Sequence, residues 1–335
     1  MIRWIAAAAV AGVVVAGAAL HHARGLLDPV GATSTPRLFE VARGDSLGAV
    51  AGRLESDGLV RSATALKLFA RWNELDGRLH VGEYELSPHQ AAAEILDTIT
   101  SGRVKTWPIT VPEGHRASEI ALRLDEAGLA DAEAFMMVVE DLDFAHALGL
   151  PGPTLEGYLY PDTYHLPRGL PAREIARSMV RLFDAVWSQQ VDALAAGTSL
   201  SKHEIVTMAS IVEKETAAAV ERPLIAAVFL NRLDKGMRLE TDPTVIYGIP
   251  DFDGNLKKRH LQDPSNAYNT YRIRGLPPGP IASPGVEALV AVVRPSDSDY
   301  LYFVSRNDGT HEFSATYEEH VNAVNRYQRR HRQRR

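Results

Sequence analysis

A long-range internal repeat constrains the fold of this chain more than any other feature. Residues 39–59 and residues 109–129 share their spacing of apolar positions, and Gly44 and Gly114, 70 residues apart, occupy equivalent places in the two copies. Each copy combines a short apolar strand, a glycine turn and a helix-period segment that ends at another glycine, as C-capped helices do. The sequence therefore predicts two small related units in the N-terminal part of the chain.

The composition is that of a globular protein with more than one domain. The chain has 335 residues, of which 45% are hydrophobic and 23% are charged, and these values are ordinary for folded domains. A net charge of -6 gives no general attraction to nucleic acid, so no nucleic-acid partner is predicted. Because the sequence contains no cysteine, disulfides, thiolate metal sites and a cysteine nucleophile are excluded.

The N-terminus carries a signal for membrane insertion. Residues 5–20 form an uncharged apolar run rich in Ala and Val, and Arg3 precedes it. A helix over residues 4–20 would be about 25 Å long, somewhat less than the roughly 30 Å hydrocarbon core of a bilayer. A signal peptide cleaved near residues 16–18 is the alternative. Because Arg3 favours a cytoplasmic N-terminus, we expect an uncleaved single-pass anchor, with the body on the extracytoplasmic side.

The coarse pattern of helices and strands predicts an α+β protein. A small α+β module is expected after the anchor, followed by a larger mixed α/β catalytic domain with a central glutamate-bearing helix. The predicted organisation is a membrane anchor at residues 1–24, a linker at 25–37, a small module at 38–106, a catalytic domain at 107–330 with the second repeat unit at 107–150, and a basic tail at 331–335.

Residues 202–216 have the pattern of a helix with two candidate catalytic carboxylates. Its apolar side chains recur at helical spacing and form one stripe, namely Ile205, Met208, Ala209 and Val212. Glu213 and Glu215 lie on opposite edges of that stripe, because two steps of about 100° separate them by roughly 200°. One wall of a cleft can therefore use one of these glutamates, and the periodicity alone does not choose between them.

The remaining motifs narrow the available chemistry to carboxylates. The sequence contains no His-Glu-x-x-His pair, no phosphate-binding loop and no Gly-x-Ser-x-Gly motif, so no metal and no cofactor are predicted. A glutamic acid at the edge of an apolar face can keep its proton near neutral pH and protonate a glycosidic oxygen. Ordinary glycoside hydrolysis also needs a second carboxylate, for which Glu156, Asp162 and Asp242 are candidates.

Segments rich in Tyr, Pro, Gly, Asn and Thr are predicted to form the walls of a binding site. Residues 151–167 have the composition of an ordered aromatic loop, and residues 241–248 and 268–279 combine stiff backbone with hydrogen-bonding side chains. The same composition also occurs in loops that serve only packing. The candidate substrate-binding residues are Glu156, Tyr158, Tyr160, Asp162, Thr241, Asp242, Tyr247, Tyr268, Asn269, Thr270, Tyr271, Gly275, Leu276, Pro277 and Pro278.

A series of long motifs gives the chain a family resemblance. Residues 208–216 read Met-Ala-Ser-Ile-Val-Glu-Lys-Glu-Thr, and further motifs follow at residues 231–233, 236–239, 241–248, 268–271 and 275–279. In this order they resemble the YceG-like (MltG) family of endolytic murein transglycosylases. The resemblance covers nearly the whole chain after the apolar N-terminal run, and it includes the loop at residues 155–164.

The resemblance implies cleavage of the bond between N-acetylmuramic acid and N-acetylglucosamine in nascent peptidoglycan, with 1,6-anhydro ends and termination of strand elongation. One glutamate would act as acid and then as base. Lytic transglycosylases carry this Glu directly before Ser or Thr, which favours Glu215 beside Thr216, with Glu213 as the alternative. The implied partners are peptidoglycan glycan strands, the inner membrane and peptidoglycan synthases (penicillin-binding proteins). A non-catalytic wall-binding or scaffold protein and a hydrolytic muramidase are the competing classes.

The first repeat copy has a resemblance of its own. It is similar to a LysM domain in nine residues: Val41, Arg43, Gly44, Asp45, Ser46, Leu47, Val50, Ala51 and Leu54. LysM modules bind glycans that contain N-acetylglucosamine, so the resemblance implies a glycan-binding role for this module. A strand, a turn and a helix also make a common packing unit without a ligand.

Overall fold

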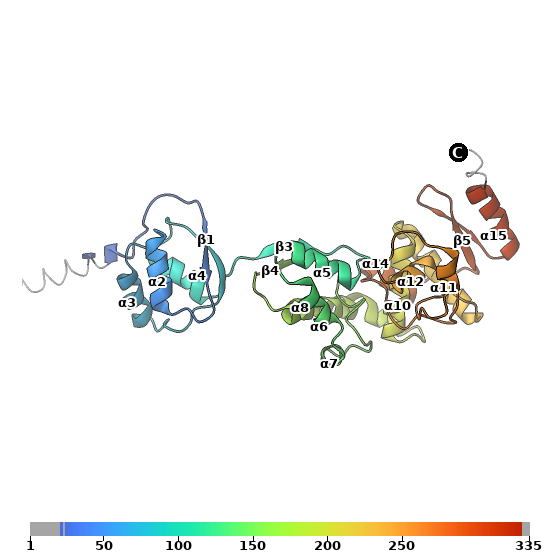
Figure 1. Ribbon diagram of the computed structural model, residues 1–335, viewed down its shortest axis with the longest axis horizontal. Coiled ribbons are helices and arrows are strands. Elements are labelled where there is room, and N and C mark those ends of the chain that lie inside the picture. Colours follow the sequence, from blue (N-terminus) through green and yellow to red (C-terminus); the bar gives the residue numbers. More distant parts are fainter. Residues whose placement is uncertain (1–20, 23, 330–335) are drawn as a thin grey trace, which may run out of the picture. The chain divides into compact units, whose positions relative to one another are not determined.

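The computed structural model describes residues 21–22 and 24–329 (Figure 1). Nearly all of the predicted membrane anchor, including the apolar run at residues 5–20, lies outside the described residues. Within the described ranges, no helix combines the length and the apolar character needed to cross a membrane. The described chain forms two compact units, the first ending at Trp107 and also including His165–Gly169, and the second made of Pro108–Tyr164 and the described residues from Leu170 onward.

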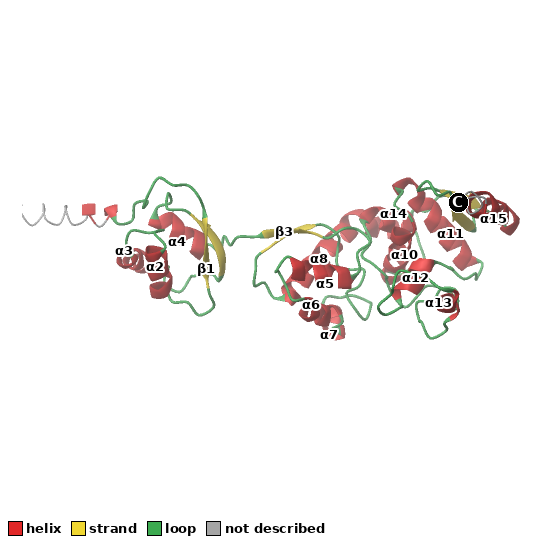
Figure 2. Cartoon of the chain, turned by 45° about the horizontal axis from the view of Figure 1, so that its top comes forward, coloured by secondary structure: helices red, strands yellow, loops and turns green. Residues whose placement is uncertain are grey.

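The first unit packs helices against a two-stranded sheet (Figure 2). Strands β1 (Arg37–Val41) and β2 (Gly82–Leu86) pair antiparallel, and the helices are α2 (Leu47–Ser56), α3 (Ala63–Trp72) and α4 (Ala92–Thr100). The segment predicted as a linker is bonded to this unit, because Gly31 N donates to the Pro88 carbonyl at 3.1 Å and the Ser87 hydroxyl donates to the Thr33 carbonyl at 3.0 Å.

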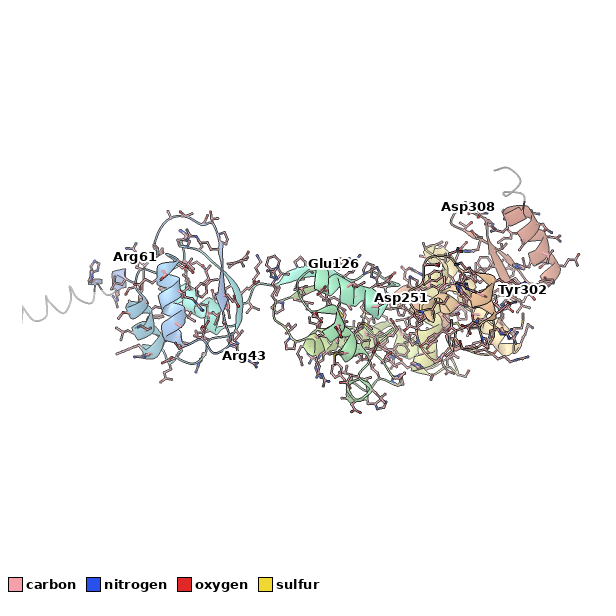
Figure 3. All side chains as sticks on the ribbon, in the orientation of Figure 1. Arg43, Arg61, Glu126, Asp251, Tyr302 and Asp308 are labelled. Carbon is pink, nitrogen blue, oxygen red and sulfur yellow. The ribbon has the colours of Figure 1, made fainter. Side chains whose placement is uncertain are left out.

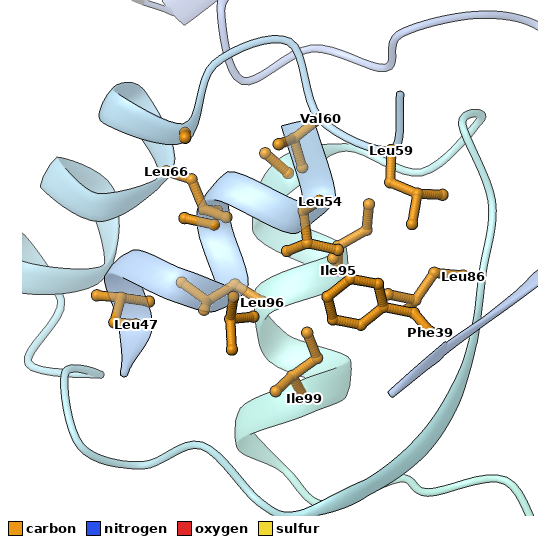
Figure 4. Close-up of a cluster of buried hydrophobic side chains, with 14 of the residues drawn as sticks. Phe39, Leu47, Leu54, Leu59, Val60, Leu66, Leu86, Ile95, Leu96 and Ile99 are labelled. Atoms are coloured by element: carbon orange, nitrogen blue, oxygen red, sulfur yellow. The ribbon is translucent and has the colours of Figure 1, made fainter. Parts of the chain in front are cut away.

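Alternation along the strands builds the core of the first unit (Figure 4). Phe39 on β1 and Leu86 on β2 face the helices, as the period of two along a strand requires. Tyr84 is fully buried, and its hydroxyl donates to the His80 carbonyl at 2.6 Å, so the polar tip is satisfied. The helices contribute the buried side chains Val50, Leu54, Leu66, Ile95, Leu96 and Ile99.

The second repeat copy has the strand, turn and helix predicted from the sequence. β3 (Trp107–Thr110) leads into α5 (Ala117–Glu126) and then α6 (Ala132–Val139) and α7 (Leu142–Ala147), while β3 pairs with β4 (Thr163–Leu166) in a two-stranded sheet. The equivalent glycines both have a positive φ, 88° at Gly44 and 73° at Gly114. A side chain at either position would strain the turn, which explains the shared glycine.

Residues 172–195, which have a helical sequence pattern, form an interrupted helix in the structure. α8 (Ala172–Val186) passes into a π-helical turn (Trp187–Val191) and a short helix α9 (Asp192–Ala195). The Trp187 indole nitrogen donates to the Asp192 carboxylate at 3.1 Å across this turn. A π-helical turn is a local widening that holds one extra residue, and a helical pattern on both sides of it predicts one continuous helix.

α10 (Lys202–Glu215) is the central helix of the second unit, and it is buried more completely than predicted. Ser201 and Glu204 form a capping box at its start. The prediction of a single apolar stripe was too narrow, because the eight residues from Ile205 to Val212 are all buried. α10 packs against α14 (Val286–Val293), α11 (Arg222–Asp234) and α12 (Asp242–Tyr247).

The C-terminal part of the second unit is a hairpin followed by a helix. β5 (Tyr302–Ser305) and β6 (His311–Ser314) pair antiparallel, and Tyr302 and the turn residue Asp308 are labelled in Figure 3. α15 (Tyr317–Val324) continues into a π-helical turn (Asn325–Arg329). α12 forms within a segment predicted to have stiff backbone, because Pro243 is compatible with a first helical turn, and α13 (Lys258–Gln262) is a second short helix in this part of the chain.

Candidate active site

Glu215 is the last residue of α10 and lines a cavity of about 340 Å³ in the second unit. The cavity lies where the end of α10 meets α11, the start of α12, β5 and α15. Its lining residues are Glu215, Phe229, Arg232, Leu239, Glu240, Thr241, Asp242, Tyr271, Phe303 and His320. This mostly polar recess contains three carboxylates, of which Glu215 comes from the end of a buried helix, and is therefore a candidate site for acid–base chemistry.

The Glu215 carboxylate is held by Thr241, whose hydroxyl donates a hydrogen bond to Glu215 Oε1. Thr241 is itself fixed by two other buried threonines. Its backbone nitrogen donates to Thr270 Oγ1 at 3.0 Å, and the Thr244 hydroxyl donates to the Thr241 carbonyl at 2.8 Å. Thr244 Oγ1 and Thr270 Oγ1 are 2.8 Å apart. This threonine network therefore fixes the orientation of the carboxylate.

The surroundings of Glu215 favour its protonated form. Burial raises the pKa of Glu215 to about 7, and the negative charge of Asp242 acts in the same direction, while the Thr241 hydrogen bond and His311 oppose the shift. A carboxyl group with this pKa is present in both protonation states near neutral pH. It can therefore donate a proton in one step and accept one in the next.

Glu213 has a different environment, although it lies only two residues away on the same helix. Its side chain is 6% exposed and forms an ion pair with Arg222 at 2.8 Å. Its second carboxylate oxygen accepts the Gly285 backbone N–H at 3.0 Å. Both oxygens are thus engaged by protein groups, and Glu213 is not among the residues that line the Glu215 cavity. The structure places Glu213 in a buried structural pair and Glu215 at the cavity, a choice that periodicity left open.

Three of the predicted substrate-binding residues join Glu215 in the cavity: Thr241, Asp242 and Tyr271. The Tyr271 hydroxyl donates to Asp242 Oδ1 at 2.8 Å. This hydrogen bond fixes the Asp242 carboxylate beside the catalytic candidate, and the charge of Asp242 contributes to the raised pKa of Glu215, after burial.

A second buried carboxylate, Glu156, lies in a separate group of predicted residues. Its oxygens accept the Ala117 backbone N–H at 3.1 and 3.2 Å and the Tyr247 hydroxyl at 3.2 Å. The Tyr247 ring packs against Tyr268 with 4.7 Å between centroids, and the Arg116 guanidinium lies over it. Burial raises the pKa of Glu156 to about 7. Because Glu156 is not a lining residue of the Glu215 cavity, it does not supply the second carboxylate of that cavity.

Several other predicted contact residues build the framework and do not face the cavity. Tyr158 is fully buried and its hydroxyl lies 2.8 Å from His203 Nδ1, while His203 Nε2 lies 3.0 Å from the Pro278 carbonyl. Asn269 is fully buried, and its amide donates to the Asp263 carbonyl at 2.7 Å. Both side chains are buried and bonded within the second unit, where they stiffen the loops, and their predicted contact with substrate stays a prediction.

The remaining predicted residues also lie outside the Glu215 cavity. Tyr160 is buried, and Asp162 is exposed and accepts the Thr163 backbone N–H at 2.6 Å. Thr270 acts through the threonine network described above. In the loop at 275–279, Pro277 is buried, Gly275 and Leu276 are half-buried, and Pro278 is exposed.

The prediction missed several residues that line the cavity. Arg232 is held by the Leu301 and Leu239 carbonyls at 2.7 and 2.9 Å, and Glu240 adopts a φ of 53°, which is strained for a side-chain-bearing residue and common at functional sites. The motif at residues 231–233 indicated Arg232. His320 stacks on Tyr302 at 5.1 Å, and burial followed by the Arg232 charge lowers the pKa of its imidazole. No sequence signal marked His320.

Within residues 21–22 and 24–329 there is no group of three or more His, Cys, Asp or Glu side chains placed to hold a metal ion. The site that the structure describes is a recess with a buried carboxylic acid at the end of a helix, which makes it a candidate for acid–base chemistry. The family model of the YceG-like family matches residues 39–326, and the chain belongs to this family.

Known relatives agree with that assignment. The chain is 30% identical over 330 residues to the endolytic murein transglycosylase of Bacillus subtilis (strain 168), covering 93% of this chain and 90% of the relative. It is 28% identical over 298 residues to the endolytic murein transglycosylase of Streptococcus pneumoniae serotype 2 (strain D39), covering 79% of this chain and 53% of that relative. A crystal structure of a YceG-like protein from Listeria monocytogenes matches with a TM-score of 0.59 and 31% identity, covering 87% of this chain and 99% of that chain.

Proposed function

We propose that this chain is an endolytic lytic transglycosylase that cleaves the bond between N-acetylmuramic acid and N-acetylglucosamine within peptidoglycan strands. The observation that carries the proposal is Glu215, a carboxylic acid with a pKa of about 7, held by Thr241 in a polar cavity. Two relatives described above are named as endolytic murein transglycosylases. A carboxylic acid with this pKa can protonate a leaving oxygen at neutral pH.

The proposed reaction uses Glu215 twice. Protonated Glu215 donates its proton to the glycosidic oxygen, and the bond from the muramoyl C1 to that oxygen breaks. The resulting carboxylate then takes the proton of the muramoyl C6 hydroxyl, whose oxygen bonds to C1 and closes a 1,6-anhydro ring. Glu215 is protonated again at the end, and no water is consumed. Thr241 keeps the carboxylate oriented through both steps.

A hydrolytic muramidase is the second candidate, and Asp242 is the observation that favours it. Asp242 lines the same cavity as Glu215 and supplies a second carboxylate. Paired carboxyl groups are what glycoside hydrolysis ordinarily requires. The hydrogen bond from Tyr271 to Asp242 leaves the other carboxylate oxygen available to orient a water molecule. The two candidates differ in their products.

The products of uncrosslinked peptidoglycan strands separate the two reactions. Strands treated with the full chain in heavy-oxygen water are analysed by mass spectrometry. Lysis gives anhydro ends that are lighter by one water and carry no heavy oxygen, whereas hydrolysis gives reducing ends labelled with it. Anhydro ends that disappear with Glu215→Gln support the proposal. Labelled reducing ends as the main product would replace it with the muramidase.

Membrane attachment and glycan binding by the first unit are further parts of this proposal. The apolar run at residues 5–20 supports a single-pass anchor in the inner membrane with the body outside the cytoplasm. In the LysM-like first unit, a cavity of about 220 Å³ is lined by Leu38, Phe39, Glu40, Ala42, Arg53 and Asp57. An exposed apolar and charged recess of this kind suits a sugar ring.

We propose that the substrate strands are nascent and that cleavage ends their elongation, with a peptidoglycan synthase as the partner. An anchored enzyme would meet strands where they emerge from the membrane, which supports the proposal. Crosslinking the full chain to synthases in membranes checks the partner, and the length distribution of newly made strands checks the effect on elongation. Unchanged lengths with an active enzyme would contradict termination.

A further inference from the structure

Helix α3 carries apolar side chains on the side that faces away from its own unit. Leu66 and Ala70 are fully buried in the core of the first unit, as an amphipathic helix requires. Leu68 and Trp72, one turn apart, are nevertheless 63% and 89% exposed. A large exposed tryptophan next to an exposed leucine is uncommon on a surface that meets only water, and it points to an interaction partner.

These two side chains belong to an apolar recess that includes the start of the described chain. The recess has a volume of about 400 Å³ and is lined by Arg24, Leu26 and Leu27 together with Leu68, Phe69 and Trp72 of α3. We call these six residues the α3 face. The Leu27 carbonyl accepts the Ala92 backbone N–H at 2.9 Å, and Leu27 packs against the core, so the entering segment is fixed to this face.

The position of the α3 face along the chain selects its occupant. The apolar run at residues 5–20 ends only four residues before Arg24. A run that inserts into a bilayer therefore places the α3 face within a few residues of the lipid surface, where tryptophan side chains are favoured. A second copy of the chain could bind the α3 face only by displacing the lipid surface, which the anchor keeps next to that face.

Basic side chains flank the apolar ones. Lys67 and Arg71 each precede one of the exposed apolar residues of α3, so they lie beside them on the helix, and Arg24 lines the recess itself. Asp76 offsets part of this charge, because its carboxylate lies 3.6 Å from Arg71 Nε. An apolar strip with a basic border fits the boundary between phospholipid headgroups and acyl chains.

We propose that the α3 face inserts into the interface of a phospholipid bilayer. The first unit then contacts the membrane directly and is not only tethered to it by the anchor. The proposal rests on the membrane attachment advanced under Proposed function and is independent of the chemistry at Glu215. Its consequence is that the first unit has a fixed side toward the lipid, set by Leu68 and Trp72.

The absence of cysteine from the chain allows a direct test with a single labelled position. Leu68→Cys on the α3 face is compared with Leu38→Cys, a leucine of the same unit that is 52% exposed and lines a different cavity. Each full-length variant is coupled to an environment-sensitive fluorophore and placed in phosphatidylcholine vesicles with or without phosphatidylglycerol. Some of the lipids carry a quencher about 5–10 Å below the headgroups, the depth reached by interfacial side chains.

We expect the label at position 68 to shift to the blue and to be quenched at least about twofold, more strongly with the anionic lipid, while the label at position 38 stays unchanged. Flotation of the same samples measures attachment separately. A chain that floats with vesicles while the label at position 68 remains unquenched overturns the proposal but not the anchor. If the label at position 68 shifts to the blue but is not quenched by the lipid, protein covers the α3 face and the proposal is overturned. If the chain does not float with the vesicles, both the proposal and the membrane anchor are overturned.

Discussion

Glu213 and Glu215 lie two residues apart on α10 and have opposite surroundings: Glu213 is paired with buried Arg222, whereas Glu215 opens into the cavity beside Thr241. The first carboxylate is held by charge and a backbone N–H, and the second by a single hydroxyl. A charged partner stabilises an ionised carboxylate, and burial without a cation stabilises a neutral one. The structure thereby assigns different roles to two side chains that the sequence presents as near equivalents.

Replacement of Glu215 by glutamine is expected to abolish cleavage without loss of folding. Glutamine keeps the size of the side chain and can still accept the Thr241 hydrogen bond, but it has no transferable proton. Loss of an acid or a base costs about 10² to 10⁴ in rate for each role, and here both roles fall on one residue. Product formation by mass spectrometry and thermal unfolding are the two measurements. Near-full activity of this variant would remove Glu215 from the mechanism.

Replacement of Glu213 by glutamine is expected to destabilise the second unit. The change leaves Arg222, 8% exposed, without its most buried partner, and breaking a buried ion pair costs about 3–5 kcal/mol. Glu287→Gln is the matched control, since Glu287 pairs with the same Arg222 but is 62% exposed, and it should cost less than about 1 kcal/mol. Urea unfolding measures both. Equal losses in the two variants would contradict the structural role of Glu213.

The pH dependence of cleavage should respond in opposite directions to changes at Thr241 and Asp242. The Thr241 hydrogen bond lowers the pKa of Glu215 from the value set by burial, and the Asp242 charge raises it. Activity requires protonated Glu215 in the first step, so it should fall as pH rises through about 7. Thr241→Val moves this fall to higher pH and Asp242→Asn moves it to lower pH, as profiles of kcat/KM against pH would show.

Thr244→Val is the control for that experiment, because Thr244 supports the Thr241 carbonyl and does not bond to Glu215. This variant should lower the rate of cleavage, because Thr241 is held less firmly. The pH at which activity falls should stay nearly unchanged. Shifts in the same direction for Thr241→Val and Asp242→Asn would contradict the electrostatic account of Glu215.

Glu156 is expected to make the folded protein less stable as pH rises. The pKa of Glu156 in the folded chain is about 7, above the ordinary value of 4.5. Between these two pH values, Glu156 is therefore protonated in the folded state and ionised in the unfolded state. The contribution of this group is fully present below pH 4.5 and is lost as pH rises through 7, with a slope of at most about 1.4 kcal/mol per pH unit.

Glu156→Gln removes the titrating proton and should flatten this slope, as urea unfolding at a series of pH values would measure. Glu204→Gln serves as the control, since hydrogen bonds from Ser201 lower the pKa of that carboxyl below its ordinary value of 4.5. The stability contributed by Glu204 is constant above pH 4.5 and is lost only as pH falls further, so this variant should leave the slope between pH 5 and 7 unchanged. A slope between pH 5 and 7 that Glu156→Gln leaves unaltered would show that Glu156 is ionised in the folded state.

Local patterns predicted much of the fold. The repeated glycine turns, the Asn-Asp-Gly hairpin at residues 307–309 and the start of α11 near Pro223 were all predictable because turn and cap residues act over a few positions. The full burial of α10 was not predictable, because it depends on other helices, α11, α12 and α14, that pack against it. The π-helical turn after α8 was also not predictable, because the sequence on both sides of it has a helical pattern.

The candidate site was predictable in part. Thr241, Asp242 and Tyr271 were predicted to bind substrate and do lie with Glu215, because their segments combine stiff backbone with polar side chains. Tyr158 and Asn269 belong to equally polar segments but are fully buried, and composition does not distinguish a loop wall from its interior. His320 comes from a helix near the end of the chain, and only tertiary packing brings it to the cavity.

The complete burial of residues 205–212 fixes the rotation of α10 about its axis, and so fixes the directions in which Glu213 and Glu215 point. The capping box at Ser201 fixes where the helix begins, and the packed middle prevents it from turning about its axis. One residue inserted within the buried stretch would rotate everything after it by about 100°. Glu215 would then leave Thr241, and Glu213 would leave Arg222. Over time, length changes in this segment should therefore be far rarer than substitutions that keep its volume.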